Sequence, residues 1–319
     1  MTRSLFRRKP KMISWRPLVE GDVVDLIAPG FAPTKGEIRG AVAFLRSWGL
    51  KPRVPPGLLG ADVLCSNSDK KRFQFLKRAL LAKDSRAIWC LRGGYGANRL
   101  LPDLNSLRRP AQSKVLIGYS DVTTLHLFLN HKWGWNTIHG PLLDRFGQGV
   151  GRPRDKREMK ALLFGDKPIL EFSELRPLNT KASRQQTLRA PITGGNLTTW
   201  ASAIGTPWEG VPRGKILFFE DIGEQGRKVD RMLVQMDQAG HLKGVKAMIF
   251  GEFIGGAQSN GRYLWREVIR RFADEAPFPV FDHFPAGHGP AQRPIPFGPR
   301  AELQMGKEPH LRVGSGFLS

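Results

Sequence analysis

The sequence predicts an α/β protein with a parallel-sheet domain in its first half and a smaller mixed α/β domain in its second half. Two patterns indicate this fold class. Short apolar runs alternate with helical patterns over residues 19–150, an order that favours a parallel sheet covered by helices. After Pro191 the alternation gives way to isolated strands and a Pro- and Gly-rich end. With 319 residues, 40% of them hydrophobic, the chain can fill two cores.

The first expected strand covers residues 22–28 and is ended by Pro29 and Gly30. The elements that follow it are, in order, helices over 35–48 and 69–82, a strand over 87–91, a short helix after Gly96, a strand over 114–118, a helix over 122–130 and a strand over 135–139. A polar stretch then begins at residue 149, and we place the end of the first domain at residue 150.

Residues 151–190 mix charges and prolines with short apolar pieces, which indicates a linker region that carries a helix or two and loops. The second domain, over residues 191–319, is expected to hold strands at 215–219 and 245–250 and a helix at 229–239. Before the first strand, residues 1–18 are expected to form a flexible basic arm. Its charges are Arg3, Arg7, Arg8, Lys9, Lys11 and Arg16.

The composition limits the partners and the compartment. A net charge of +22 attracts nucleic acid, anionic wall polymers and acidic small molecules without selecting among them. Neither an export signal nor an apolar run long enough to cross a bilayer is evident, so we expect a cytoplasmic protein without membrane insertion. The two cysteines, Cys65 and Cys90, fit a reducing compartment, and Cys90 lies in an apolar run typical of a buried thiol.

The first motif that could carry chemistry is Ser120. It follows the apolar strand ending at Gly118 and precedes a helical pattern, which is where a nucleophile is presented on a sharp turn near a helix N-terminus. The alternative is that Ser120 only caps the helix. Upstream, Gly93 and Gly94 follow another strand, and their unobstructed N–H groups could form an oxyanion hole, a tight turn or a phosphate cradle.

Acidic residues end the strand at 215–219. Glu220 could orient a histidine and stabilise its protonated form, while Asp221 and Glu224 could instead cap the helix that starts near Lys228. His288 lies between two glycines in a loop, a placement that favours exposure and chemistry. The other six histidines are not flanked by glycines in this way, and we expect them to have structural roles. Since no His-Glu-x-x-His motif or cysteine quartet is present, we expect no metal site.

Together these motifs resemble the LD-carboxypeptidases, the serine peptidase family that includes murein tetrapeptide carboxypeptidases and microcin C self-immunity hydrolases. The ordered set of blocks carries the resemblance, from about residue 20 to residue 300. The blocks are residues 27–29, 92–96, 118–123, 139–141, 194–197, 219–224, 230–233, 287–289 and 296–298.

The resemblance implies a flavodoxin-like, class I amidotransferase-like first domain and a site in the cleft between the domains. It implies Ser120 as nucleophile, His288 as general base and then acid, and Glu220 as the group that orients His288. The backbone N–H groups of Gly94 and Asp121 would form the oxyanion hole. Substrate contacts are expected from Arg92, Gly93, Tyr119 and Asn196. No cofactor is implied, and a homodimer is expected.

The implied reaction removes the terminal D-alanine from a murein tetrapeptide during peptidoglycan recycling, and the acidic substrate suits a basic protein. Two alternatives stay open. One is hydrolysis of aminoacyl nucleotides, as in the microcin immunity branch. The other is a non-enzymatic module that binds anions or nucleic acid, although no specific nucleic-acid signature is present. Two departures from the family pattern bear on substrate choice: Gly226 and Arg227 replace a Pro-Tyr pair, and Ala286 replaces an aromatic residue.

Overall fold

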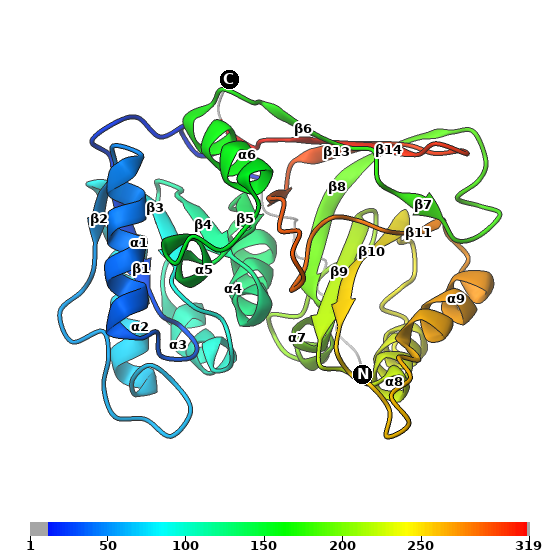
Figure 1. Cartoon of the computed structure of the whole chain (residues 1–319), viewed down its shortest axis with the longest axis horizontal. Coiled ribbons are helices and arrows are strands. Elements are labelled where there is room, and N and C mark those ends of the chain that lie inside the picture. Colours follow the sequence, from blue (N-terminus) through cyan, green and yellow to red (C-terminus); the bar gives the residue numbers. More distant parts are fainter. Residues whose placement is uncertain (1–11, 318–319) are drawn as a thin grey trace.

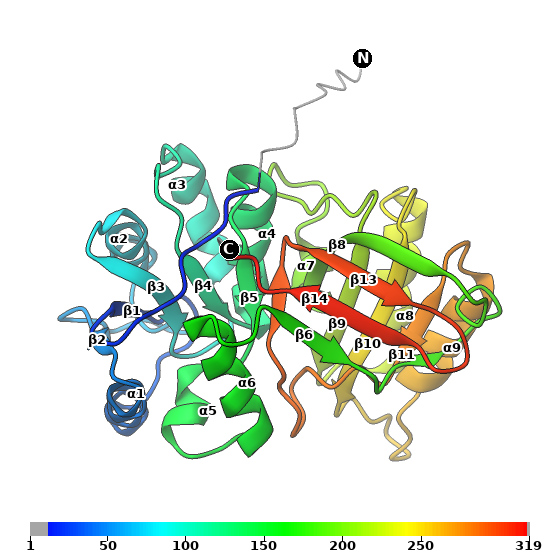
Figure 2. The same ribbon diagram turned by 90° about the horizontal axis from the view of Figure 1, so that it is seen from above.

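A computed structural model describes residues 12–317, which form two sheets side by side (Figures 1 and 2). The first sheet has six strands in the order β12-β5-β4-β3-β1-β2, and its first five strands in the chain are parallel. Its strands are β1 (Val23–Ile27), β2 (Lys51–Arg53), β3 (Ser85–Cys90), β4 (Val115–Gly118), β5 (Thr137–His139) and β12 (Ile295–Phe297). The expected parallel sheet in the first half is confirmed.

Helices cover both faces of this sheet. In Figure 2, α1 and α5 lie on one face, while α2, α3 and α4 lie on the other. A capping box fixes the start of α1, because Thr34 accepts from the backbone of Glu37 while the Glu37 side chain accepts from the backbone of Thr34. The helices of this half are α1 (Lys35–Ser47), α2 (Asp69–Leu81), η1 (Ala97–Leu100), α3 (Leu101–Ser106), η2 (Ser120–Val122), α4 (Thr123–Phe128), η3 (Leu129–Trp133) and α5 (Leu143–Gly147).

The second sheet has eight strands in the order β6-β14-β13-β8-β9-β10-β11-β7. Strands β8 to β11 run parallel at its centre and antiparallel strands flank them, which confirms the expected mixed architecture. The strands are β6 (Ile169–Phe172), β7 (Arg176–Pro177), β8 (Thr187–Asn196), β9 (Ile216–Ile222), β10 (Ala247–Ile254), β11 (Val280–Asp282), β13 (Arg300–Gln304) and β14 (His310–Gly314). The helices are α6 (Pro153–Phe164), α7 (Leu197–Ser202), α8 (Gly226–Gln238) and α9 (Trp265–Glu275).

Two regions differ from the sequence prediction. Residues 151–190, expected as a linker with helices and loops, supply α6 and also strands β6 and β7 of the second sheet. Conversely, β12 comes from the range assigned to the second domain but pairs antiparallel with β5 of the first sheet. Both differences have one cause: these strands are short, and long-range pairing rather than a local pattern defines them.

The basic arm expected over residues 1–18 is packed where the structure describes it. Trp15 is 1% exposed and its ring meets that of Phe317, with centroids 5.6 Å apart. Leu18 is also buried. Residues 1–11 lie outside the described residues. None of the helices within 12–317 combines the length and the apolar character needed to cross a bilayer.

One hydrophobic cluster crosses from the first sheet to the second. It contains Ile117 and Ile138 from the first sheet, Ile192 and Phe218 from the second, and Phe297 from β12, all buried. Because a close-packed core resists displacement, this cluster fixes the end of β4 relative to β9. The site described next lies on residues at and just after these strand ends.

Candidate active site

Ser120 is the first residue of η2, at the strained turn that follows β4. Its φ is 64°, a left-handed conformation that non-glycine residues rarely adopt and that is concentrated at functional sites. The helix N-caps here are Tyr119 for η2 and Val122 for α4, and neither cap bonds through its side chain. The interpretation of Ser120 as a helix cap is therefore wrong, and the geometry is that of a nucleophile elbow.

The glycine loop after β3 lies directly against this turn. A Cβ atom on Gly93 would lie 2.9 Å from Cβ and 3.2 Å from Oγ of Ser120. Gly94 has a φ of 95°, and a side chain there would overlap the ring of Phe31. Only glycine permits this approach, which brings the peptide backbone of the loop close to the serine.

The side chain of Asp121 links the serine turn to Ala97, which follows the glycine loop. Its carboxylate is buried and accepts a hydrogen bond from the backbone N–H of Ala97 at 2.8 Å. Burial raises the pKa of Asp121 to about 6, against the lowering effect of that bond. The sequence indicated a role only for the backbone N–H of Asp121. The structure adds a carboxylate that holds the two loops in register.

Glu220 and His288 form a buried pair in the second half of the site. Nδ1 of His288 lies 2.5 Å from Oε2 of Glu220, which is fully buried near the end of β9. Because a carboxylate only accepts, this contact assigns the proton to Nδ1 and leaves Nε2 available as a base. The His288 side chain is 11% exposed, so the expectation of an exposed histidine is wrong.

The environment of His288 favours its charged form. Burial opposes that form, but the charge and hydrogen bond of Glu220, followed by the charge of Asp221, outweigh it and raise the pKa of His288 above its usual value. Glu220 therefore stabilises the protonated form of His288.

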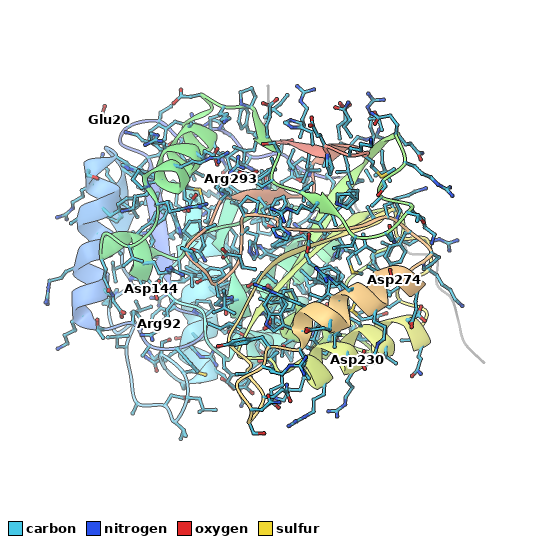
Figure 3. The ribbon with its side chains drawn as sticks, turned by 45° about the vertical axis from the view of Figure 1, so that its right-hand side comes forward. Glu20, Arg92, Asp144, Asp230, Asp274 and Arg293 are labelled. Atoms are coloured by element: carbon cyan, nitrogen blue, oxygen red, sulfur yellow. The ribbon has the colours of Figure 1, made fainter. Side chains whose placement is uncertain are left out.

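Several contacts hold the loop of His288 in place. The Gln292 side chain donates to the carbonyl of Gly287 at 2.8 Å, and the backbone N–H groups of Gly289 and Ala291 face the carboxylate of Glu252. The far end of the loop is fixed by buried Arg293, labelled in Figure 3. Its Nε donates to Glu158 of α6 at 2.7 Å.

Tyr119 joins the two halves of the site. It immediately precedes Ser120, and its buried ring lies against the imidazole of His288 with centroids 4.6 Å apart. Burial raises the pKa of the Tyr119 hydroxyl, which keeps it neutral. The buried ring of His139 is also near Tyr119, with centroids 5.9 Å apart, and burial holds the pKa of His139 well below its usual value. The serine turn and the His288–Glu220 pair are thus in contact through one aromatic residue.

Asn196 and Asp221 form a hydrogen-bonded pair next to Glu220. Asn196 pairs with Glu220 in the β8–β9 register, but its amide donates to Asp221 at 2.8 Å and its Oδ1 caps α7 through Thr199. Asp221 also accepts from the backbone and hydroxyl of Thr198. Burial, and then the charge of Glu220, raises the pKa of Asp221 to about 6.

The capping expected for the helix near Lys228 is wrong. The N-cap of α8 is Gln225, whereas Asp221 bonds to the first turn of α7. Glu224 instead forms an ion pair with Lys228 at 3.2 Å. The sequence suggested α8 because it is the next helix along the chain, but the end of β9 lies beside α7 in space.

Two arginines lie near the glycine loop and the His288 loop. Arg92 was expected to bind substrate. It donates to the carbonyl of Ala32 at 3.3 Å, and the carboxylate of Glu37 lies 3.5 Å from its guanidinium. Arg92 also lies near Asp144 (Figure 3). Arg145 was not predicted from the sequence. It contacts both Tyr119 and the His288 loop. A lone arginine at the start of a short helix carries no sequence signal, because only folding brings it to His288.

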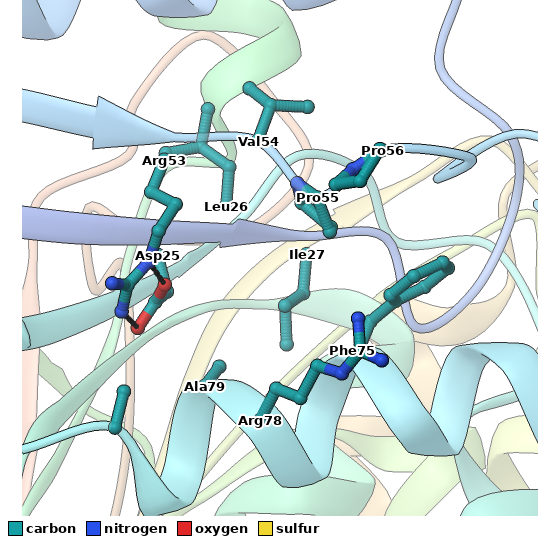
Figure 4. Close-up of a pocket in the computed structure, with 11 residues that line it drawn as sticks. Asp25, Leu26, Ile27, Arg53, Val54, Pro55, Pro56, Phe75, Arg78 and Ala79 are labelled. Atoms are coloured by element: carbon teal, nitrogen blue, oxygen red, sulfur yellow. Dashed lines mark hydrogen bonds and ion pairs between the residues drawn. The ribbon is translucent and has the colours of Figure 1, made fainter.

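No other site competes with this one for the predicted residues. Among residues 12–317, no three His, Cys, Asp or Glu side chains gather in a way that could hold a metal ion. A cavity of about 310 Å³ lies between β1, the end of β2 and α2 (Figure 4), and none of its lining residues is a predicted site residue. The lining residues are Asp25, Leu26, Ile27, Arg53, Val54, Pro55, Pro56, Phe75, Arg78, Ala79 and Ala82.

Comparison with known families assigns the class of protein. A model of the LD-carboxypeptidase N-terminal domain matches residues 24–140, and a model of the LD-carboxypeptidase C-terminal domain matches residues 189–303. The chain therefore belongs to the LD-carboxypeptidase family, a family of serine peptidases. The resemblance inferred from the ordered sequence blocks is confirmed.

Individual relatives are similar to this chain over nearly its whole length. The murein tetrapeptide carboxypeptidase of Pseudomonas aeruginosa is 30% identical over 91% of this chain and 95% of its own length. The microcin C7 self-immunity protein of Escherichia coli is 27% identical over 95% of this chain and 96% of its own. Among solved structures, the muramoyltetrapeptide carboxypeptidase of Oxalobacter formigenes superposes with a TM-score of 0.80 at 26% identity, covering 93% of this chain and all of that one.

Proposed function

We propose that this protein is a serine LD-carboxypeptidase that hydrolyses the amide bond before the C-terminal D-alanine of murein tetrapeptides, in peptidoglycan recycling. One observation carries the proposal. The buried His288–Glu220 pair lies against Tyr119, the residue that precedes the left-handed Ser120. A serine on a strained turn, one residue away from an aromatic ring that packs on an oriented histidine, supports the arrangement that acyl transfer uses.

The reaction begins with attack by Oγ of Ser120 on the carbonyl carbon before D-alanine, while Nε2 of His288 takes the hydroxyl proton. Negative charge develops on the carbonyl oxygen, and the backbone N–H groups of Gly94 and Asp121 stabilise it. His288 then protonates the departing amine of D-alanine, which leaves an ester on Ser120. Water, deprotonated by His288, hydrolyses that ester and regenerates the enzyme. Glu220 keeps His288 oriented through both steps.

The substrate assignment rests on charge and on the relatives. A tetrapeptide of the wall carries several carboxylates, and a chain with a net charge of +22 attracts such a molecule at long range. The relatives in P. aeruginosa and O. formigenes are named for activity on tetrapeptides of this kind.

Product analysis tests the proposal. The protein is incubated with a murein tetrapeptide ending in D-alanine and, as the matched control, with the same peptide ending in L-alanine. We expect release of D-alanine and the tripeptide, identified by mass spectrometry, and no cleavage of the control. Equal cleavage of both peptides, or of neither, would contradict the proposal.

A second candidate is hydrolysis of an aminoacyl nucleotide, favoured by the likeness to the microcin C7 self-immunity protein over nearly the whole chain. The same triad would cleave either substrate. An aspartyl sulfamoyl adenosine added to the same assay separates the two. If it is hydrolysed while the tetrapeptide persists, the substrate assignment is wrong and the triad assignment stands.

A further inference from the structure

Arg145 on α5 reaches across the boundary between the two halves of the site. Its guanidinium donates to the hydroxyl of Tyr119 at 3.5 Å, to the carbonyl of His288 at 3.4 Å and to the carbonyl of Gly289 at 3.4 Å. These distances lie beyond the usual range for N–H···O bonds, so the contacts are weak. The side chain is part-buried, and it lies beside the residues that flank the reacting groups.

The charge of Arg145 has no ion-pair partner among the described residues. Its acceptors are a phenol and two carbonyls, and no carboxylate of residues 12–317 lies within 4.0 Å of its guanidinium. The adjacent Asp144 accepts from the backbone N–H of Arg145 at 2.7 Å rather than from its side chain. Arg92 and Arg293, by contrast, have Glu37 at 3.5 Å and Glu158 at 2.7 Å.

A partly buried guanidinium with no carboxylate at ion-pair distance is costly unless an anion binds to it during function. A peptidase that removes only the last residue must recognise a free carboxylate close to the scissile bond. A guanidinium is the side chain whose fork of donors best matches a carboxylate. Arg145 contacts the backbone carbonyl of His288, whose imidazole protonates the departing amine in the proposed reaction, and this contact places it near the group that acts on the leaving residue.

We propose that Arg145 binds the C-terminal carboxylate of the substrate and so restricts the site to carboxypeptidase action. The inference rests on the proposed function, because it concerns the leaving residue of that reaction. When substrate enters, the weak contacts to carbonyls at 3.4 Å give way to a charge-assisted pair with the carboxylate.

The test compares two tetrapeptides that differ only at the C-terminus, one a free acid and one a primary amide. We expect the wild-type protein to favour the acid by roughly 100-fold in kcat/KM, the order of magnitude for one desolvated charge pair. Arg145→Gln should lose most of this preference, because cleavage of the acid falls while cleavage of the amide changes little. Arg145→Lys should retain part of it, since the charge remains but the fork is lost.

Arg157→Gln is the matched control. Arg157 is exposed on α6 and undergoes the same change of charge, so its acid-to-amide ratio should equal that of the wild type. A second readout needs no turnover. In the Ser120→Ala protein, the acid should bind more tightly than the amide, and adding Arg145→Gln should abolish that difference.

Each outcome decides the inference. If Arg145→Gln slows both substrates equally, Arg145 only positions the His288 loop and the inference is overturned. If the wild type cleaves acid and amide equally well, the inference is overturned while the hydrolytic function stands. If the wild type cleaves neither peptide, the proposed function fails and the inference fails with it. Should Arg145→Gln not fold, Arg145→Lys and the binding comparison decide the question.

Discussion

The two halves of the candidate site are built by different means. On the first sheet, backbone conformation positions the side chain of Ser120. Ser120 has a left-handed conformation, and Gly93 and Gly94 bring the peptide chain against it. On the second sheet, charge sets the properties of the site. Glu220 is buried, and among the described residues His288 is the one cationic side chain at hydrogen-bond distance from it. Backbone shape therefore controls the proposed nucleophile, and electrostatics controls the proposed base.

This difference predicts two kinds of defect. Substitutions of Ser120 or of the glycine loop should change the rate without moving its pH dependence, because they displace atoms rather than charges. Substitutions in the second half should change both, because the pKa of His288 depends on Glu220.

Ser120→Ala should remove essentially all turnover, by a factor on the order of 10⁶, because no other group can form the ester. The protein should remain folded, since the alanine methyl group is smaller than the side chain it replaces. Release of D-alanine and thermal unfolding measure the two properties. Persistent turnover near the wild-type rate would remove Ser120 from the mechanism.

Glu220→Gln should lower kcat/KM by roughly 10⁴-fold, as expected when an orienting acid is replaced by its amide. It should also move the acidic limb of the pH profile. His288 must be neutral to act as base. Because Glu220 raises the pKa of His288, the acidic limb of the wild-type profile lies above the usual histidine pKa. Without that charge, burial dominates and the limb moves to lower pH. A pH–rate series measures it, and a limb that stays in place would count against the pair.

Gly93→Ala should slow turnover by about 100-fold, because its Cβ would lie 2.9 Å from Cβ of Ser120 and displace the serine. The acidic limb should not move. Gly36→Ala in α1 is the matched control, since a Cβ there meets nothing closer than 3.7 Å. A shifted pH profile in Gly93→Ala would undo the contrast between shape and charge.

Trp15→Ala should leave kcat/KM within a few-fold at a temperature where the protein is folded, but it should lower the free energy of unfolding by roughly 3–5 kcal/mol. Trp15 is 1% exposed, its ring meets that of Phe317, and it belongs to the buried hydrophobic cluster. Removing the chain through Arg16 should have a similar effect, because it removes Trp15. Unchanged thermal stability would show that the start of the described chain is dispensable.

The sequence predicted the first half of the molecule well because its elements have local signatures. Apolar runs defined β1, β3 and β4, and the Gly118–Ser120 turn stood out between a strand and a helical pattern. Strands such as β6 and β14 were missed, since their pairing joins residues far apart in the chain.

The functional residues divide in the same way. Ser120, Glu220 and His288 were proposed from short motifs and family order, but contact through Tyr119 arises only from the packing of the two halves. The carboxylate of Asp121, the burial of His288 and the position of Arg145 could not be predicted. Each depends on which side chains and loops fold against it, and no local pattern records that.

In the proposed mechanism Ser120, activated by His288 and Glu220, becomes acylated by the substrate. The enzyme is mixed with tetrapeptide, the reaction is quenched with acid after milliseconds, and the modified peptide is mapped by mass spectrometry. We expect a tripeptidyl ester on Ser120 in the wild type and none in His288→Ala. An acyl group on another residue, or ester formation that is unaffected by His288→Ala, would contradict it.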